Sequence, residues 1–296
     1  MDSSLYLMGI SFAILSGIIN NFGIILQKKV VNEIRAEVKF GRALIKNPLW
    51  LFGLIIQLGI GTIFFLLAQV YIGPALIPGL MASGLIILAF GSVKIIGETL
   101  KRDEIIGILL MIGAIFLLGI SGLSIDISEQ NLLDLMFLFR IIIFSLIVFI
   151  SSIICEILQR KIEKYSGILL SIFSGLMFSL SNFWVSLLLG TIINVFQGIY
   201  SLGELILFIC SSLILIATNF IGILKIQESF KVAQASNMIP IQQVPIQITS
   251  IFIYLLIFLL QPPSIMSIIF LILGIFLILI SSFLLGKRQA QLEKIK

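Results

Sequence analysis

Histidine is absent from this 296-residue sequence, and cysteine occurs only twice. Histidine is the commonest metal ligand and general base, so its absence argues against haem sites, proton relays and most intramembrane proteases. Cys155 and Cys210 both lie in apolar runs, which supports neither a disulfide framework nor a metal site. We therefore expect no enzyme and no cofactor.

Charged residues are also scarce, at 11% of the chain, whereas 59% is hydrophobic and the mean hydropathy is +1.22. This composition lies far outside that of soluble domains. Apolar stretches of about twenty residues recur along the chain, each long enough to cross a hydrocarbon core of about 30 Å as a helix. The sequence predicts an all-α, polytopic transmembrane helical bundle with about nine spans.

The predicted spans alternate with short connections, and basic residues gather in every second connection. The other connections carry acidic residues or no charge. The positive-inside rule then places the N-terminus outside and the C-terminus in the cytoplasm of a multi-pass cell membrane protein. The net charge of +5 is thus a topology signal, and we expect no nucleic-acid partner. The nine spans are Leu5–Leu26, Leu49–Tyr71, Ala75–Gly97, Ile105–Gly122, Leu135–Leu158, Ile168–Gly190, Gly203–Leu224, Val232–Leu260 and Ile265–Leu285.

Two charged residues lie inside predicted spans. Lys94 precedes Glu98 by one helical turn, so we expect an ion pair between them near the membrane surface. Arg140 lies deeper in the fifth span and has two interpretations: it reaches outward to Asp134, or it acts as a counterion for a substrate.

The first four spans resemble the last four. The sequence ILSG at Ile14–Gly17 matches IFSG at Ile172–Gly175, and Pro78 corresponds to Pro240. Because five crossings separate equivalent spans, the second copy runs through the membrane in the opposite sense. Inverted repeats with interrupted helices are typical of secondary transporters. We predict repeats at residues 1–122 and 167–286, a linking span with its loops at 123–166, and a basic cytoplasmic tail at 287–296.

Residues 97–114 read GETLKRDEIIGILLMIGA. This segment resembles the signature of the drug/metabolite transporter superfamily, with its motif positions at Gly97, Glu98, Gly107 and Gly113. The resemblance covers most of the chain, and the nine-span layout is most similar to the NIPA-type magnesium transporter branch. It implies a polytopic carrier. In the second copy, the position that matches Glu98 falls near Gln261, so the acidic signature occurs once.

Polar residues are concentrated in the eighth span. Ser236, Pro240, Gln243, Gln247 and Ser250 are spaced by four and three residues, which places them on one helix face. Proline also frees backbone carbonyls, so we expect helix breaks at Pro78, Pro240 and Pro245. Polar residues also pack helices together without binding any ligand. The predicted substrate pathway comprises Ser16, Asn20, Gln57, Gln69, Asn182, Asn219, Asn237, Gln243 and Gln247.

Three functions fit this pattern. The first is a secondary carrier that moves a small solute by alternating access. The second is a route for magnesium or another divalent cation, which the resemblance implies, although magnesium is usually held by one or two carboxylates and no Asp or Glu lies at mid-span. The third is a membrane interaction protein without transport, in which cysteines at Asn20 or Gln243 would not react with a soluble thiol reagent. The expected partners are the lipid bilayer, a small-molecule or ion substrate and, as an open alternative, a second copy in a homodimer.

Overall fold

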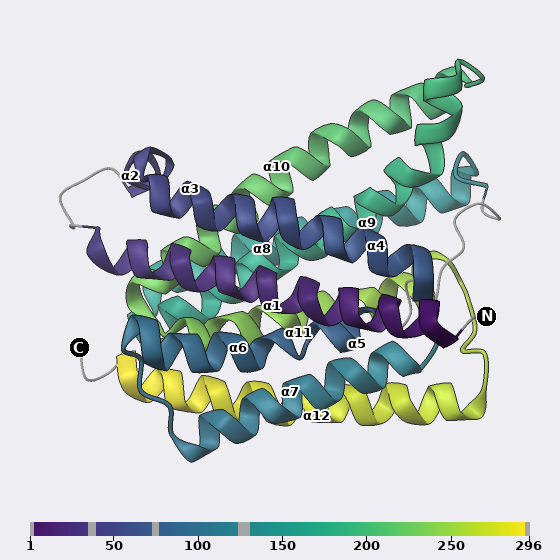
Figure 1. Cartoon of the computed structure of the whole chain (residues 1–296). Helices are drawn as coiled ribbons and strands as arrows, with labels where there is room; N and C mark the ends of the chain where they lie inside the picture. The colour runs from purple at the N-terminus through teal and green to yellow at the C-terminus, as the bar shows by residue number, and fades with distance from the viewer. Residues whose placement is uncertain (1–2, 35–39, 73–76, 124–130, 294–296) are drawn as a thin grey trace. The chain divides into compact units, whose positions relative to one another are not determined.

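The computed structural model describes residues 3–34, 40–72, 77–123 and 131–293 (Figure 1). These residues form helices and short connections, without strands. Eight helical segments are long and apolar enough to cross a membrane, and the shorter apolar helix Gly84–Ile96 lies in the remaining predicted span. The predicted bundle of about nine spans is therefore confirmed.

The helices follow the predicted spans closely. Three of them are π-helical segments within spans, at η1 (Ile55–Ile60), η2 (Ser92–Ile96) and η4 (Ile253–Ile257). A 3-10 turn, η3 (Glu163–Tyr165), precedes the sixth span. The α-helices of the described residues are α1 (Ser3–Glu33), α2 (Phe40–Lys46), α3 (Pro48–Leu54), α4 (Gly61–Ile72), α5 (Ile77–Met81), α6 (Gly84–Gly91), α7 (Arg102–Ile120), α8 (Leu135–Lys161), α9 (Ser166–Gln197), α10 (Leu202–Val232), α11 (Ala235–Phe252) and α12 (Ile265–Glu293).

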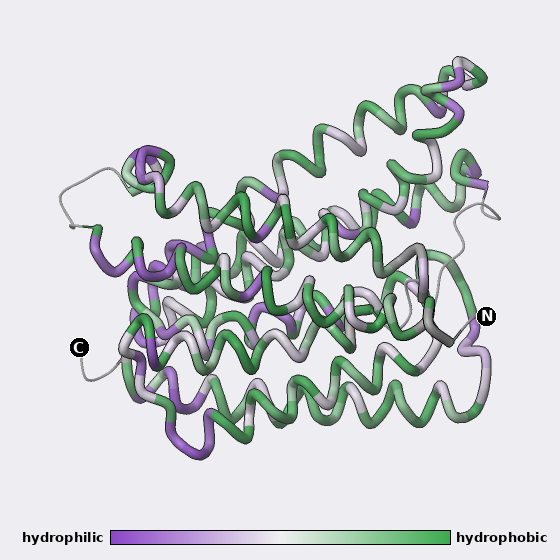
Figure 2. Tube along the Cα trace, viewed as in Figure 1, coloured by the Kyte–Doolittle hydropathy of each residue, from purple (hydrophilic) through white to green (hydrophobic). Residues whose placement is uncertain are grey.

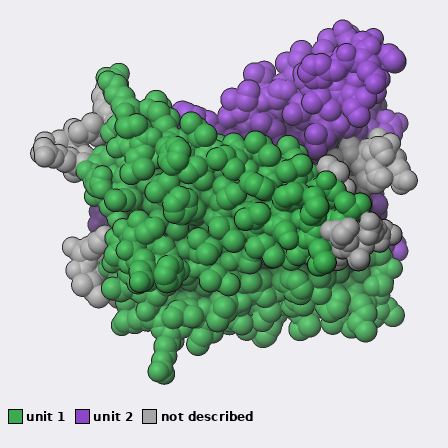
Figure 3. All heavy atoms as spheres, viewed as in Figure 1, with its two compact units in different colours: residues 1–123, 227–241, 262–296 green, residues 124–226, 242–261 purple. Residues whose placement is uncertain are grey.

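The chain forms two compact units, coloured separately in Figure 3. Unit 1 comprises residues 1–123, 227–241 and 262–296, and unit 2 comprises residues 124–226 and 242–261. The boundaries fall inside α10 and α11, so the last turns of α10 and the first turns of α11 belong to unit 1. The predicted division into repeats at residues 122 and 166 stays a prediction.

In unit 1, α7 and α12 lie side by side (Figure 1). Their close approach depends on small residues: a Cβ on Gly107 would lie 2.8 Å from the side chain of Leu285, and one on Gly274 would lie 2.8 Å from Leu118. The hydroxyl of Ser281 also donates to the carbonyl of Gly107 over 2.7 Å. Gly107 of the family motif is therefore a packing residue. Figure 2 shows hydrophobic residues along both helices and hydrophilic residues where α7 begins.

In unit 2, α8 packs against α9 through aromatic side chains. The rings of Phe144 and Phe183 meet edge to face at 5.2 Å, an arrangement that contributes about 0.5–1.5 kcal/mol beyond area burial. The indole of Trp184 is buried and donates to the hydroxyl of Ser145 over 3.2 Å. Trp184 is thus a core residue of this unit.

Serine and glycine make equivalent contacts in the two copies of the matched motif. The hydroxyl of Ser16 donates to the carbonyl of Gly61 over 2.7 Å, and that of Ser174 donates to the carbonyl of Gly222 over 2.7 Å. Each bond links a helix to the next span within one unit. The glycines that follow these serines also match. A Cβ on Gly17 would overlap the backbone at Met81 of α5, which contains Pro78, and a Cβ on Gly175 would overlap the backbone at Gln242 of α11, which contains Pro240.

The third and eighth spans end in the same backbone motif. Gly97, at φ +80°, directly follows η2 in the left-handed region, and Leu259, at φ +53°, follows η4 after one intervening residue, Phe258. These residues lie nineteen positions after Pro78 and Pro240, respectively. The shared spacing supports the predicted repeat, whose inverted sense stays a prediction.

The prolines of the eighth span do not break its helix. α11 runs without interruption from Ala235 to Phe252, through both Pro240 and Pro245. The predicted break at these residues is therefore wrong, because neighbouring protein can accommodate carbonyls that proline leaves without an N–H donor. In the third span, α5 ends at Met81 and a turn at Ala82 and Ser83 precedes α6.

The connection predicted between the seventh and eighth spans also needs correction. The connection predicted after Leu224 is helical, since α10 continues to Val232 and buries Ile226 and Phe230. Burial of these two apolar side chains stabilises the helix beyond Lys225, the first of the basic residues from which a loop was predicted.

Arg140 does not reach outward to Asp134. Its Nε donates to the carbonyl of Met136 over 3.2 Å, and its guanidinium lies 5.8 Å from the ring centroid of Phe137. Asp134 instead caps α8, where its carboxylate accepts from the backbone N–H of Phe137 over 2.9 Å.

Candidate functional site

The predicted pathway residues fall in both units, so each set is described within its own unit. Ser16, Asn20, Gln57 and Asn237 belong to unit 1, and Asn182, Asn219, Gln243 and Gln247 belong to unit 2. Gln69 and Pro78 lie in α4 and α5, but their side chains are outside the described residues.

In unit 1, three glutamine amides form a chain of hydrogen bonds. Gln227 of α10 donates to Gln27 of α1 over 2.5 Å, and Gln27 donates to Gln57 of η1 over 2.6 Å. Gln27 and Gln227 are fully buried, and Gln57 is half-buried. The Oε1 atom of Gln227 is buried without a hydrogen-bond donor among the described residues. Gln57 is thus the most accessible of the three amides, and it lies in a π-helix, which often marks a functional position. The predicted pathway included Gln57 but neither Gln27 nor Gln227.

Glu98 of the family motif is bound to the N-terminus of α11. Its Oε1 accepts from the backbone N–H of Ala235 over 2.7 Å. Its Oε2 accepts from the hydroxyl and the N–H of Ser236, over 2.7 and 3.2 Å. A carboxylate at this position satisfies orphan N–H donors and complements the positive end of the helix dipole. Lys94, which was expected to pair with Glu98, instead lies 5.6 Å from the ring centroid of Phe90.

A second carboxylate holds the next residue of α11. Glu104 is fully buried, and its Oε1 accepts from the amide of Asn237 over 2.7 Å. Its Oε2 accepts from the backbone N–H of Lys101 over 2.6 Å and lies 3.7 Å from Arg288 of α12. Asn237 is therefore part of a buried network in which Glu104 links three helices.

The C-terminal end of α10 is held by a buried cation. The ammonium of Lys28 is 4% exposed and donates to the carbonyls of Phe230 and Ala233. A cation at this position complements the negative end of the helix dipole. The connection from α10 to α11 is thus bounded by Lys28 on one side and Glu98 on the other.

In unit 2, amides and hydroxyls link α9 to the neighbouring spans. The amide of Asn219 donates to Ser181 over 2.5 Å, and the amide of Gln242 donates to Ser174 over 2.7 Å. Asn182, the residue predicted from the sequence, is exposed on its unit. Ser181 and Gln242 were missed because a one-residue step on a helix turns the side chain by about 100°.

Gln243 and Gln247 lie one helical turn apart on α11. Both are half-buried, and the amide of Gln247 donates to that of Gln243 over 3.5 Å. Pro245, between them, is buried and would contact a Cβ added to Gly175. The two glutamines are consequently the accessible amides of this helix, whereas Gln242 is committed to packing.

The chemistry of these groups favours binding through neutral hydrogen bonds. Among the described residues, no three His, Cys, Asp or Glu side chains are grouped as a metal site would require. The buried carboxylates of Glu98 and Glu104 already accept from N–H or O–H donors. A metal bound directly at either carboxylate would compete with those donors for its oxygens. Carboxamide groups such as Gln57 and Gln243 can both donate and accept, so they suit a polar solute or the water shell of an ion.

Comparison with known proteins gives one match. A family model described as Magnesium transporter NIPA matches residues 4–291, nearly the whole chain. No curated protein and no solved structure matches the chain.

Proposed function

The chain belongs to the magnesium transporter NIPA family and is a membrane transporter, and we propose that it moves magnesium by alternating access. The match over residues 4–291 is the observation that carries this assignment. The transported ion is substrate and needs no permanently occupied site.

The polar groups of the spans support recognition of a hydrated ion. Magnesium loses its waters reluctantly and usually keeps several of them when bound. Coordinated waters are hydrogen-bond donors, and the side-chain oxygens of Gln243 and Gln247 in unit 2 can accept hydrogen bonds from them. The half-buried state of these amides leaves them accessible, while Glu98 and Glu104 hold helices together. In this proposal, the amides bind the outer face of the water shell.

The duplicated contacts support alternating access. Ser16 and Ser174 make the same bond to a glycine carbonyl, each within its own unit. Two copies of one helical unit with opposite sense are the usual basis of a carrier that exposes one site to either side. In such a carrier, the bound ion is exposed first to one side of the membrane and then to the other, where it is released.

A neutral or zwitterionic solute is the second candidate substrate. The side chains of Gln243, Gln247 and Asn219 favour it, because they carry no net charge and can bind a neutral solute through hydrogen bonds alone. Arg140 retains the alternative of a substrate counterion in this case.

Magnesium influx into liposomes tests the assignment. We expect saturable influx under an imposed gradient, measured with an entrapped magnesium-sensitive dye. The double substitution Gln243→Ala and Gln247→Ala should raise the half-saturating concentration about tenfold or more, because two hydrogen bonds of about 1 kcal/mol each are lost. Gln197→Ala removes an exposed amide at the end of α9 and should leave influx unchanged.

Two results would contradict this expectation. Influx no greater than in empty liposomes, with equal amounts of folded protein, would remove magnesium as substrate and leave the neutral solute to be tested in the same vesicles. Influx that is saturable but equal in the wild type and the double variant would retain magnesium and remove the proposed site.

A further inference from the structure

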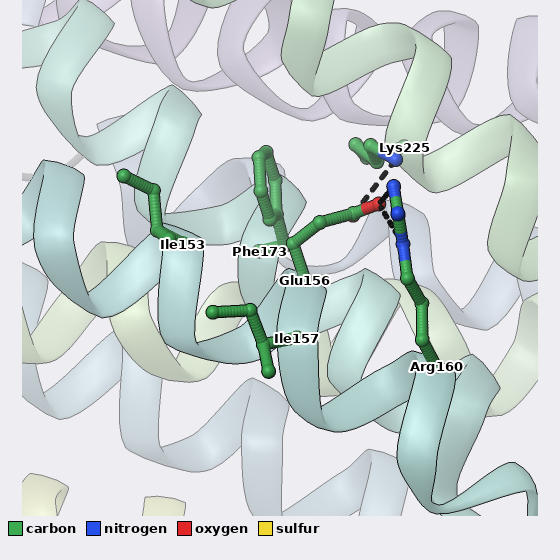
Figure 4. Close-up of a pocket in the computed structure, with 6 residues that line it drawn as sticks. All are labelled: Ile153, Glu156, Ile157, Arg160, Phe173 and Lys225. Atoms are coloured by element: carbon green, nitrogen blue, oxygen red, sulfur yellow. Dashed lines mark hydrogen bonds and ion pairs between the residues drawn. The ribbon is translucent and has the colours of Figure 1, made fainter.

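A pocket on unit 2 combines a basic rim with apolar walls (Figure 4). It is lined by Ile153, Glu156, Ile157, Arg160, Phe173 and Lys225, and its volume is about 360 Å³. This is near the lower end of the range of about 300–1,000 Å³ for small-ligand pockets. Helices α8, α9 and α10 each contribute to it, so the pocket is formed by tertiary packing.

Its charged groups form a fixed triad. Glu156 accepts from Arg160 through Nη2 and Nε, over 2.7 and 3.2 Å. The other carboxylate oxygen lies 2.9 Å from the ammonium of Lys225, as Figure 4 shows. The ammonium also lies 5.5 Å from the ring centroid of Phe173. Two cations share one carboxylate, so the triad carries one excess positive charge.

Arg160 has donors to spare. A guanidinium has five N–H donors, of which the bonds to Glu156 use those of Nε and Nη2. Its side chain is 72% exposed, so the remaining donors are open to a ligand. The bonds to Glu156 restrict the side chain, and Lys225 restricts Glu156 in turn. Preorganised guanidinium groups favour phosphate because they bind its oxygens in a fork geometry.

The apolar wall continues from this charged rim along α8. Ile153, Ile157 and Arg160 are spaced by four and three residues, which places them on one face of the helix. Ile153 and Ile157 are 43% and 48% exposed. An apolar chain that follows this face would cover both isoleucines while a head group stays at Arg160.

The pocket lies at the end of the fifth span where Lys161 and Lys164 follow, which is the predicted cytoplasmic end. Anionic lipids are concentrated in the cytoplasmic leaflet, and basic pockets between transmembrane helices bind their head groups. We propose that this pocket binds an anionic phospholipid, with the phosphate on Arg160 and an acyl chain along Ile153 and Ile157. Glu156 and Lys225 act as positioning residues for the guanidinium. Binding here does not depend on which substrate the chain carries.

Native mass spectrometry of the full chain in detergent tests lipid binding. Phosphatidylglycerol and phosphatidylcholine of equal chain length are titrated separately, and inorganic phosphate serves as a competitor. We expect phosphatidylglycerol to be retained preferentially. Arg160→Gln should weaken its binding about tenfold or more, because a hydrogen bond to a charged group contributes about 1.5–3 kcal/mol.

Lys161→Gln is the matched control, because it removes the neighbouring positive charge on α8 from a residue outside the pocket. It should leave phosphatidylglycerol binding within about twofold, a change of less than 0.5 kcal/mol. Ile157→Ser should weaken phosphatidylglycerol without changing any interaction with inorganic phosphate. Unchanged helical content, measured by circular dichroism, shows that each variant is folded.

Three outcomes would overturn the lipid site. Equal loss in the two charge variants would indicate a general surface-charge effect. Equal retention of the two lipids would remove the head-group interaction. Displacement by millimolar inorganic phosphate, with no effect of Ile157→Ser, would identify a phosphate site without a lipid component.

Discussion

Among the residues of the family motif, Gly97 adopts a backbone conformation that favours glycine. It ends η2 in the left-handed region at φ +80°, and a Cβ built on it would meet no atom within 4 Å. Any cost of substitution therefore comes from the backbone conformation and not from a clash. For a residue with a Cβ, that conformation costs about 1–2 kcal/mol.

We expect Gly97→Ala to destabilise the protein by about 1–2 kcal/mol. Gly113→Ala is the matched control, because its Cβ would lie 3.9 Å from Leu277 and its backbone is helical. That control should be neutral or stabilising, since alanine favours helix over glycine. Thermal unfolding in detergent micelles measures both variants, and equal midpoints would contradict the backbone explanation.

Single residues also show where sequence reasoning reaches its limit. The predicted substrate pathway includes Ser16, whereas in the structure its hydroxyl donates a hydrogen bond to the carbonyl of Gly61. Helical spacing cannot distinguish a hydroxyl that binds a neighbouring helix from one that faces a substrate. The predicted pathway likewise includes Asn182, whereas its neighbour Ser181 accepts the hydrogen bond from the amide of Asn219.

At the scale of elements, α11 begins at a carboxylate supplied from the connection between η2 and α7. Glu98 follows the left-handed Gly97 and accepts from Ala235 and Ser236, which are distant in sequence. The sequence marked Glu98 as a motif residue but not as a cap, because helix-capping rules consider neighbours in the chain. Spans could be predicted from apolar length, whereas this contact depends on tertiary packing.

We expect Glu98→Gln to destabilise the protein by about 1–2 kcal/mol, because it removes a buried charge that complements the dipole of α11. Glu163→Gln, which neutralises an exposed carboxylate in η3, should change stability by less than about 0.5 kcal/mol. Chemical unfolding followed by circular dichroism compares the two. A loss of stability no larger in Glu98→Gln than in Glu163→Gln would remove the capping role.

At the scale of the whole molecule, composition and the length of the apolar runs predicted the polytopic bundle. The division into units was not foreseen, because the boundaries lie within α10 and α11 and leave no break in composition. The charged residues that are buried in unit 1, Lys28, Glu98 and Glu104, and the half-buried Arg288 all lie near helix ends. By the positive-inside pattern, all four belong to the predicted cytoplasmic side. Their hydrogen bonds and ion pair therefore connect the helix ends on that side of unit 1.

Cysteine labelling in intact cells tests this orientation. Cys155 and Cys210 are first replaced by alanine, and one exposed residue per variant is then changed to cysteine. A membrane-impermeant thiol reagent should label cysteines at Asn131 and Ser201, in connections predicted outside, without permeabilisation. Cysteines at Lys161 and Lys287 should react only after the membrane is opened, because the basic ends of their spans are retained in the cytoplasm. The reverse pattern would invert the topology, and labelling of all four in intact cells would remove the alternation of the nine spans.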